Sequence, residues 1–153
     1  MKTGKKGIDI IKKWEGFRSK PYLDIAGVPT IGYGATHYGN GFRVTMADNP
    51  ITMEKASELL DFMIPEYEGY VHKLVTACLN QNQYDAMVSF TYNLGPANLK
   101  ESTLLEKLNK NPNDESIAYE FSRWKKAGGK VRNGLVKRRR QEADLYFELK
   151  CDC

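Results

Sequence analysis

Cysteine and histidine are scarce in this chain of 153 residues, which has three cysteines and two histidines. An odd number of cysteines, two of them at Cys151 and Cys153, does not make a disulfide framework, so we expect reduced thiols, with Cys78 on a helix. A metal site would need partner ligands, and His37 and His72 lie far from the two terminal cysteines in sequence. We therefore expect no metal centre.

Long apolar runs are also absent. The N-terminal stretch MKTGKKGIDII has basic residues but lacks the apolar run of about 7–15 residues that a signal peptide needs. No stretch approaches the roughly 18 apolar residues of a membrane span. We therefore expect the protein to be made in a cytoplasm and to remain there at first.

A strong excess of either charge is missing as well. Lysine and arginine number 23 against 19 aspartates and glutamates, for a net charge of +4. This mild basic excess would help the protein approach an anionic polymer or surface, but it is too small to argue for nucleic acid by itself. The length and the 41% hydrophobic content fit one ordinary globular domain, which could have two lobes.

Helical periodicity surrounds one short segment that lacks it. The stretch GIDIIKKWEG predicts a short helix that ends at Gly16, where a capping glycine belongs. From Phe17 to Val44, glycine, proline, tyrosine and threonine dominate, which is typical of a small sheet with tight turns. Beyond Thr52, a plausible N-cap, the periodicity is helical again, although Pro65 should kink or break the first of these helices.

Five further segments have the spacing of helices after that proline. They are the continuation as far as Cys78, then QNQYDAMVSFTYNLG, STLLEKLNK, NDESIAYEFSRW with a cap at Asn113 or Asp114, and finally GLVKRRRQEADLYFEL. One helix, a small sheet and then only helices predict an α+β fold. We expect a sheet lobe over about residues 14–50, a helical lobe over about 52–149 plus the N-terminal helix, and a ligand cleft between them.

Two carboxylates and a hydroxyl stand close together in and beside the non-helical segment. Glu15 lies at the C-terminal end of the first helix, where the helix dipole and the flanking Trp14 and Phe17 favour a protonated carboxyl. Asp24 lies at a turn within reach of water and backbone donors, and should stay ionised. Thr30, on the returning strand, could orient a water molecule. Such opposed environments predict an acid and a base.

Each of these residues also has an ordinary explanation. A glutamate at a helix end is usually solvated, an aspartate beside a turn usually belongs to the turn, and a threonine suits a strand. The combination and its spacing favour catalysis over three coincidences. Tyr22 and Tyr33 flank the three residues and either line the ligand cleft or pack the sheet. Ser102 and Thr103 begin a short helix whose N–H groups could meet the ligand, or Ser102 simply caps that helix.

The basic cluster VKRRR, residues 136–140, has two interpretations. One is a solvated helix face balanced by Glu142 and Asp144, and the other is attraction to an anionic cell-wall polymer or lipid. A nucleic-acid partner is not expected, because no aromatic residues are interleaved with the basic ones. His72 is expected to be an exposed helix residue.

Four blocks in order resemble the phage-type lysozymes, the endolysins of lambdoid and T-even phages. The first is the pattern E-x8-D-x5-T of Glu15, Asp24 and Thr30, followed directly by IGYG. The others are LNQNQYDAMVSFTYNLG, STLLEKLN and SRWKKAGGKVRNGLVKRRRQEADLY. The similarity covers nearly the whole chain, from about Ile8 to Phe147. Many relatives have histidine directly after the second glycine, where this chain has Ala35; His37, two residues later, is expected to be a structural or surface histidine.

The resemblance implies a lysozyme-like fold and a muramidase that causes bacterial lysis. Such an enzyme hydrolyses the β-1,4 bond between N-acetylmuramic acid and N-acetylglucosamine in peptidoglycan. Glu15 would protonate the leaving oxygen, while Asp24 and Thr30 would hold and activate a water molecule, an inverting arrangement with carboxyl groups about 6.5–9.5 Å apart. No cofactor would be needed. A monomer, released from the host cytoplasm to the periplasm or wall by a holin-type pore protein, is expected from the resemblance.

Other classes of function remain open from the sequence. A lytic transglycosylase cuts the same bond with a catalytic glutamate, but it needs no water-activating base such as Asp24 with Thr30. A non-catalytic wall-binding domain could use the same scaffold, because a fold does not prove an activity. A basic DNA-binding domain is the most distant alternative.

Overall fold

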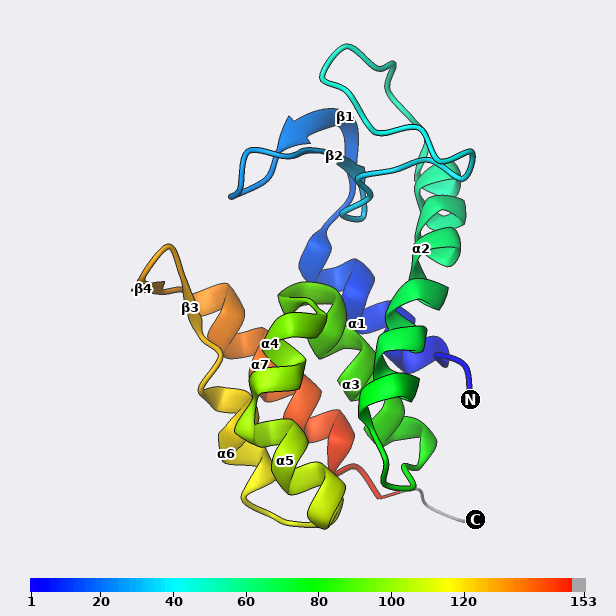
Figure 1. Cartoon of the computed structure of the whole chain (residues 1–153). Coiled ribbons are helices and arrows are strands. Elements are labelled where there is room, and N and C mark those ends of the chain that lie inside the picture. Colours follow the sequence, from blue (N-terminus) through cyan, green and yellow to red (C-terminus); the bar gives the residue numbers. More distant parts are fainter. Residues whose placement is uncertain (150–153) are drawn as a thin grey trace. The chain divides into compact units, whose positions relative to one another are not determined.

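Two compact units make up the fold of the computed structural model, which describes residues 1–149. The sheet unit is Ile11–Pro65, and the helical unit combines Met1–Ile10 with the chain from Glu66 onward. Helix α1 (Lys5–Glu15) and helix α2 (Met53–Leu74) each run from one unit into the other (Figure 1). Cys151 and Cys153, predicted to be reduced thiols, lie outside the described residues.

The sheet unit is built on one antiparallel hairpin. Strand β1 (Arg18–Leu23) pairs with β2 (Pro29–Gly32), so that Tyr22 lies opposite Thr30 and Leu23 opposite Pro29. Gly16, with φ of 70°, ends α1 and turns the chain into β1, as predicted. Isolated bridges continue the ladder after β2, and the small sheet expected between residues 17 and 44 is confirmed. The core of the unit contains Ile11, Ile31, Tyr33, Val44, Ala56, Leu59 and Leu60.

Helix α2 begins as predicted but does not break where expected. The Thr52 hydroxyl accepts a hydrogen bond from the Lys55 N–H at 3.1 Å, which makes it the N-cap. The helix continues through Pro65 to Leu74, so of the two predicted outcomes the break is wrong, and the kink stays a prediction. A proline inside a helix removes the hydrogen bond of its own nitrogen and crowds the carbonyl four residues earlier, but apolar residues buried before and after it, among them Ile64 and Val71, favour the continuous helix.

Helix α3 (Gln81–Leu94) is the centre of the helical unit. Asn80 caps it reciprocally: its side chain accepts from the Gln83 N–H at 2.8 Å, and the Gln83 side chain accepts from the Asn80 N–H at 3.0 Å. Because α2 ends at Leu74 and α3 needs this cap, the residues between are a connection. Cys78 therefore lies exposed in a loop, not on a helix as predicted.

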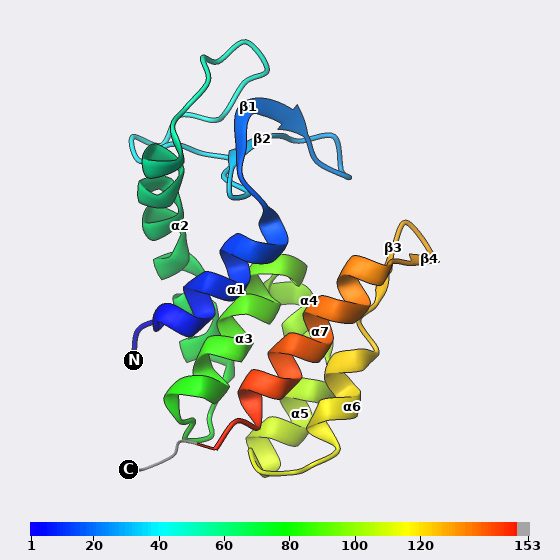
Figure 2. The same cartoon turned by 180° about the vertical axis from the view of Figure 1, so that it is seen from behind.

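Within residues 1–149, four helices follow α3. They are α4 (Pro96–Glu101), α5 (Thr103–Lys110), α6 (Ile117–Ser122) and α7 (Asn133–Tyr146). Helix α3 packs against α4 and α7, and α6 packs against α5 and α7 (Figure 2). Most of the residues of α3 are buried, including polar ones such as Asp85 and Ser89. The mixture of small antiparallel sheets and many helices confirms the α+β class.

Two local predictions in this region need correction. The N-cap position of α6 is Ser116, not Asn113 or Asp114, because Asp114 instead accepts hydrogen bonds from the N–H and hydroxyl of Ser116. A second hairpin, β3 (Lys126–Ala127) with β4 (Lys130–Val131), lies between α6 and α7, in a region where the sequence predicts only helices. Two glycines in succession, Gly128 and Gly129, turn this hairpin with positive φ angles of 59° and 75°.

A buried carboxylate holds the N-terminal end of α1 within the helical unit. Asp85 of α3 is 1% exposed. It accepts hydrogen bonds from the backbone N–H groups of Gly4 at 2.8 Å and Gly7 at 3.2 Å, and from the Gln81 amide at 2.7 Å. The first N–H groups of a helix lack partners within it, so Asp85 caps α1 from another helix.

Two of the four cations of the basic cluster on α7 are buried, contrary to the predicted solvated face. Arg138 and Arg139 are 3% and 0% exposed, and Glu142 is 0% exposed. One oxygen of Glu142, Oε1, accepts from Arg138 Nε at 3.2 Å, Arg139 Nη2 at 2.7 Å and the Ser89 hydroxyl at 3.0 Å. Positions three and four residues apart share one face of a helix, and this face of α7 packs on α3. Among residues 1–149, no helix is both long and apolar enough to cross a membrane.

We expect Glu142→Gln to lower the free energy of unfolding by about 3–5 kcal/mol, because it leaves buried guanidinium charge without its carboxylate. Glu106→Gln is the matched control, since Glu106 is 63% exposed in its ion pair with Lys110. The control should cost less than about 1 kcal/mol. Urea unfolding of both variants gives the comparison, and equal costs would contradict the structural role of the buried cluster.

Candidate active site

All three predicted catalytic residues belong to the sheet unit. Glu15 is the last residue of α1, Asp24 follows β1, and Thr30 lies on β2. Glu15 and Asp24 are half-buried, whereas Thr30 is buried, with 3% exposed. Because the chain turns at Gly16 and again after Asp24, a short segment brings a helix end and a hairpin into one unit.

The turn between the strands fixes the carboxylate of Asp24. Its Oδ1 accepts a hydrogen bond from the Val28 N–H at 2.8 Å, and its own N–H donates to the Val28 carbonyl at 3.0 Å. Gly27 donates to the Asp24 carbonyl at 2.9 Å and has φ of 76°, a conformation that favours glycine. Asp24 therefore belongs to the turn, which is the structural alternative to a catalytic role. However, only one of its two carboxylate oxygens, Oδ1, accepts a hydrogen bond within that turn.

The hydroxyl of Thr30 is oriented by the same turn. It donates to the Val28 carbonyl at 2.8 Å, so its proton is committed and its oxygen remains an acceptor. Val28 thus bonds to both predicted water-handling residues, its N–H to Asp24 and its carbonyl to Thr30. The two side chains are consequently held in a fixed relation by one residue of the loop.

The pKa of the Tyr22 phenol is affected by the carboxylates of both Glu15 and Asp24. Burial raises the pKa of its phenol, the negative charges of Glu15 and Asp24 raise it further, and the guanidinium of Arg18 opposes them. The guanidinium lies 4.8 Å from the centroid of the Tyr22 ring. The pKa of Tyr22 thus responds to both carboxylates, and Tyr22 lies opposite Thr30 in the β1–β2 ladder. Arg18 was not predicted, although its position on the same strand as Tyr22 was a usable signal.

The other predicted substrate-binding residues favour their structural alternatives. Tyr33 is 7% exposed, and its ring centroid lies 5.9 Å from that of Phe17 and 5.5 Å from Lys12 Nζ, so it packs the sheet unit. The Ser102 hydroxyl accepts from the Leu105 N–H at 3.0 Å and donates to the Leu99 carbonyl at 2.7 Å, so it caps α5. A role for Ser102 and Thr103 in binding glycan stays a prediction.

Neither histidine joins the three predicted catalytic residues. His37 is exposed and its Nδ1 lies 2.9 Å from the Thr36 hydroxyl, while Ala35 is 1% exposed. His37 is therefore a surface histidine, as expected. His72 is exposed on α2, also as expected, and its Nε2 lies 3.0 Å from the Met1 carbonyl. In the described part of the chain, no group of histidine, cysteine and carboxylate side chains is placed to hold a metal ion.

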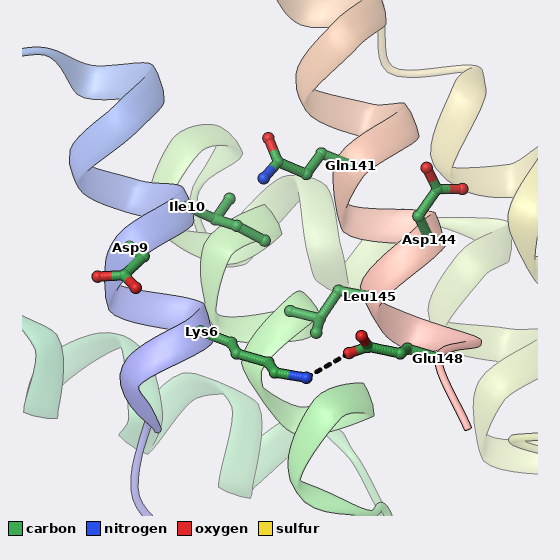
Figure 3. Close-up of a pocket in the computed structure, with 7 residues that line it drawn as sticks. All are labelled: Lys6, Asp9, Ile10, Gln141, Asp144, Leu145 and Glu148. Carbon is green, nitrogen blue, oxygen red and sulfur yellow. Dashed lines mark hydrogen bonds and ion pairs between the residues drawn. The ribbon is translucent and has the colours of Figure 1, made fainter. Parts of the chain in front are cut away.

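A groove of about 490 Å³ lies elsewhere, between α1 and α7 in the helical unit (Figure 3). Ile10 and Leu145 supply its apolar surface, and an ion pair between Lys6 and Glu148 crosses one end. Asp9, Gln141 and Asp144 complete the lining. None of the three predicted catalytic side chains lines this groove, so it is separate from the site assembled around Tyr22.

Comparisons with known proteins match nearly the whole chain. The family model described as phage lysozyme matches residues 12–142. The endolysin of Bacillus phage B103 is 45% identical over 149 residues, which cover 96% of this chain and 54% of that protein. The endolysin of Salmonella phage P22 is 42% identical over 147 residues, which cover 96% of this chain and 99% of that protein.

Solved structures agree with the sequence matches. The endolysin from Escherichia coli O157:H7 phage FAHEc1 has a TM-score of 0.86 and 37% identity, covering 97% of this chain and 94% of that one. The chain spans about half the length of the two Bacillus phage endolysins that it matches, those of phages B103 and PZA. It spans almost the full length of the P22 protein.

We expect Asp24→Asn and Glu15→Gln each to lower the pKa of the Tyr22 phenol, because each removes a negative charge that repels the phenolate. NMR titration of labelled tyrosine rings measures this without any activity assay. Asp61→Asn, which removes an exposed carboxylate from α2 of the same unit, is the control and should leave Tyr22 unchanged. If neither site variant moves the Tyr22 titration, the carboxylates do not converge on it.

Proposed function

This chain belongs to the phage lysozyme family, and on that premise we propose that it hydrolyses peptidoglycan and thereby lyses bacteria. The family resemblance and the lysozyme-like α+β fold predicted from sequence are confirmed. The observation that carries the proposal is the β1–β2 hairpin, in which Val28 binds the side chains of both Asp24 and Thr30 and Tyr22 lies opposite Thr30. Two carboxyl groups beside one oriented hydroxyl are the groups that glycoside hydrolysis needs.

Glu15 is the general acid in this proposal. It donates its proton to the glycosidic oxygen as the bond from that oxygen to the anomeric carbon breaks. It is the last residue of α1, directly before the turn at Gly16 that leads into β1. The bond cleaved is the β-1,4 link between N-acetylmuramic acid and N-acetylglucosamine.

Asp24 and Thr30 together handle the attacking water. With Asp24 Oδ1 held by the Val28 N–H, the second oxygen accepts one proton of the water. The Thr30 hydroxyl already donates its proton to the Val28 carbonyl, so its oxygen accepts a hydrogen bond from the second O–H of the water. A water that donates to both keeps a lone pair for the anomeric carbon. It attacks from the face opposite the leaving group, so the configuration inverts.

The wider assignment follows the family. We assign both units to one lysozyme-like domain, with Tyr22 and Arg18 beside the cleaved bond. A monomer that leaves the cytoplasm through a separate holin-type pore protein remains an expectation from the resemblance. The chain spans only about half the length of its Bacillus phage relatives. Lysis by the whole protein is therefore proposed here together with the hydrolytic activity.

Glu15→Gln should reduce the clearing of permeabilised bacterial cells by about 10²–10⁴-fold, because the amide cannot donate the proton. Circular dichroism and thermal unfolding should match the parent, and binding to purified walls should remain. Glu54→Gln, at an exposed glutamate in the first turn of α2, is the matched control and should clear at the parental rate. Undiminished clearing by Glu15→Gln would refute the assigned acid.

The stereochemistry of the product tests the water-handling pair. Freshly cleaved glycan should carry the new reducing end in the α configuration before mutarotation, as early-time NMR can record. Asp24→Asn should slow this hydrolysis without creating 1,6-anhydro ends. Retention of the β configuration would contradict the inverting role, and anhydro ends in mass spectra would instead identify a lytic transglycosylase.

A further inference from the structure

The positive charge of the chain is concentrated in one stretch. Every charged side chain between Glu120 and Glu142 is a lysine or an arginine. Arg138 and Arg139 are buried with Glu142, and Arg123 pairs with Glu120 at 3.0 Å. The remaining cations are exposed on the β3–β4 hairpin and the outer side of α7: Lys125, Lys126, Lys130, Arg132, Lys137 and Arg140.

The ladder of the second hairpin gathers three of these cations on one face. Lys126 lies opposite Val131 and Ala127 opposite Lys130, and the Arg132 N–H donates to the Lys125 carbonyl at 2.9 Å, which extends the same register by one pair. Side chains alternate between the faces of a hairpin, so Lys125, Lys130 and Arg132 share one face. We call these three residues the basic face. Lys126 and Val131 share the other.

The hairpin is held in place at its base and along its length. The Trp124 ring, just before β3, packs edge-on against Phe90 of α3, with centroids 5.8 Å apart. The Arg132 guanidinium donates through Nε to the Ala127 carbonyl at 3.3 Å, so it lies along the hairpin. Figure 1 shows the hairpin projecting beyond the ends of α6 and α7. The basic face is therefore an anchored, exposed surface.

The basic face brings like charges together, and the ion pairs of the described residues do not balance them. Like charges directly opposite each other on paired strands are destabilising, and Lys125 lies opposite Arg132. Among residues 1–149, no carboxylate forms an ion pair with Lys125, Lys130 or Arg132. Like charges placed opposite each other without any gain in stability point to a function for this surface.

We propose that the basic face binds the fixed anions of the cell-wall polymer and so holds the protein on its substrate between cuts. The proposal rests on the proposed function for the identity of that polymer. Carboxylates of the peptide stems and phosphates of wall-attached polymers offer the same chemistry, an extended row of negative charge. Lysine is a compact, well-hydrated charge suited to such diffuse attraction rather than to bidentate recognition.

Other polyanions fit this surface less well. Single-stranded nucleic acid is bound by basic grooves whose aromatic rings stack on bases, and Trp124, the aromatic residue nearest the hairpin, packs inward on Phe90. An interfacial membrane site needs a broad apolar surface beside its charges. Here Val131 alone is an exposed large apolar residue on the hairpin, and it lies on the opposite face.

Binding to purified walls tests the proposal in the Glu15→Gln background, so that cleavage does not complicate the measurement. The basic-face variant Lys125→Gln/Lys130→Gln/Arg132→Gln should bind about tenfold or more weakly than its parent at about 0.1 M salt. A control variant, Lys2→Gln/Lys73→Gln/Lys100→Gln, removes the same charge from exposed positions of the same unit. It should bind within about twofold of the parent.

Two further measurements distinguish electrostatic binding by the basic face from a loss of binding caused by damage to the fold. Raising the salt to about 1 M should abolish the difference between the variants, because screening then acts over about 3 Å. The basic-face variant should unfold at the same or a higher temperature than the parent, since it relieves repulsion. Equal binding by the basic-face and control variants would overturn the proposal.

Treated walls identify the anion. Loss of binding after hydrofluoric acid extraction assigns the phosphates, and loss after amidation assigns the carboxylates. Binding that survives both treatments, or equally tight basic-face-dependent binding to duplex DNA or to vesicles with anionic lipid, overturns the assignment to the wall. If the parent protein with Glu15 intact fails to clear cells although the binding results are as expected, the proposed function is wrong, but the basic face still binds wall anions.

Discussion

The register of the β1–β2 hairpin is the constraint on which the candidate site depends. Tyr22 opposite Thr30, with the turn closed by Asp24 and Val28, places three side chains relative to one another through backbone hydrogen bonds. A shift of one residue would turn Thr30 to the other face of the hairpin and separate it from Tyr22. The register holds because Gly27 adopts a positive φ in the turn, and because Ile31 is completely buried.

Helix α1 has a carboxyl group at each of its two ends. Asp85 caps the N-terminal end, where free N–H groups and the dipole stabilise a negative charge. Glu15 is the last residue of the helix, and Gly16 lets the chain leave at once for β1. The same helix thus uses one acid for structure and presents the other for the proposed chemistry.

Burial divides the basic residues of the C-terminal third into two sets with different roles. Arg138 and Arg139 meet Glu142 in the interior, where both guanidinium groups donate to one carboxylate oxygen, and the same oxygen joins α7 to α3 through Ser89. The lysines of the β3–β4 hairpin have no such partner among the described residues and face solvent. Composition alone could not separate the sets, because both are runs of the same residue types.

Local chemistry determined much of this protein from sequence: the caps at Thr52 and Gly16, the helical periods, and the spacing of Glu15, Asp24 and Thr30. These are interactions between near neighbours, which short segments specify. Tertiary structure alone decided that α2 continues through Pro65, that Tyr33 and Ser102 are occupied by packing and capping, and that two arginines of VKRRR are buried. Each of those outcomes depends on which distant residues cover a side chain, and burial is a property of the packed chain rather than of its local pattern.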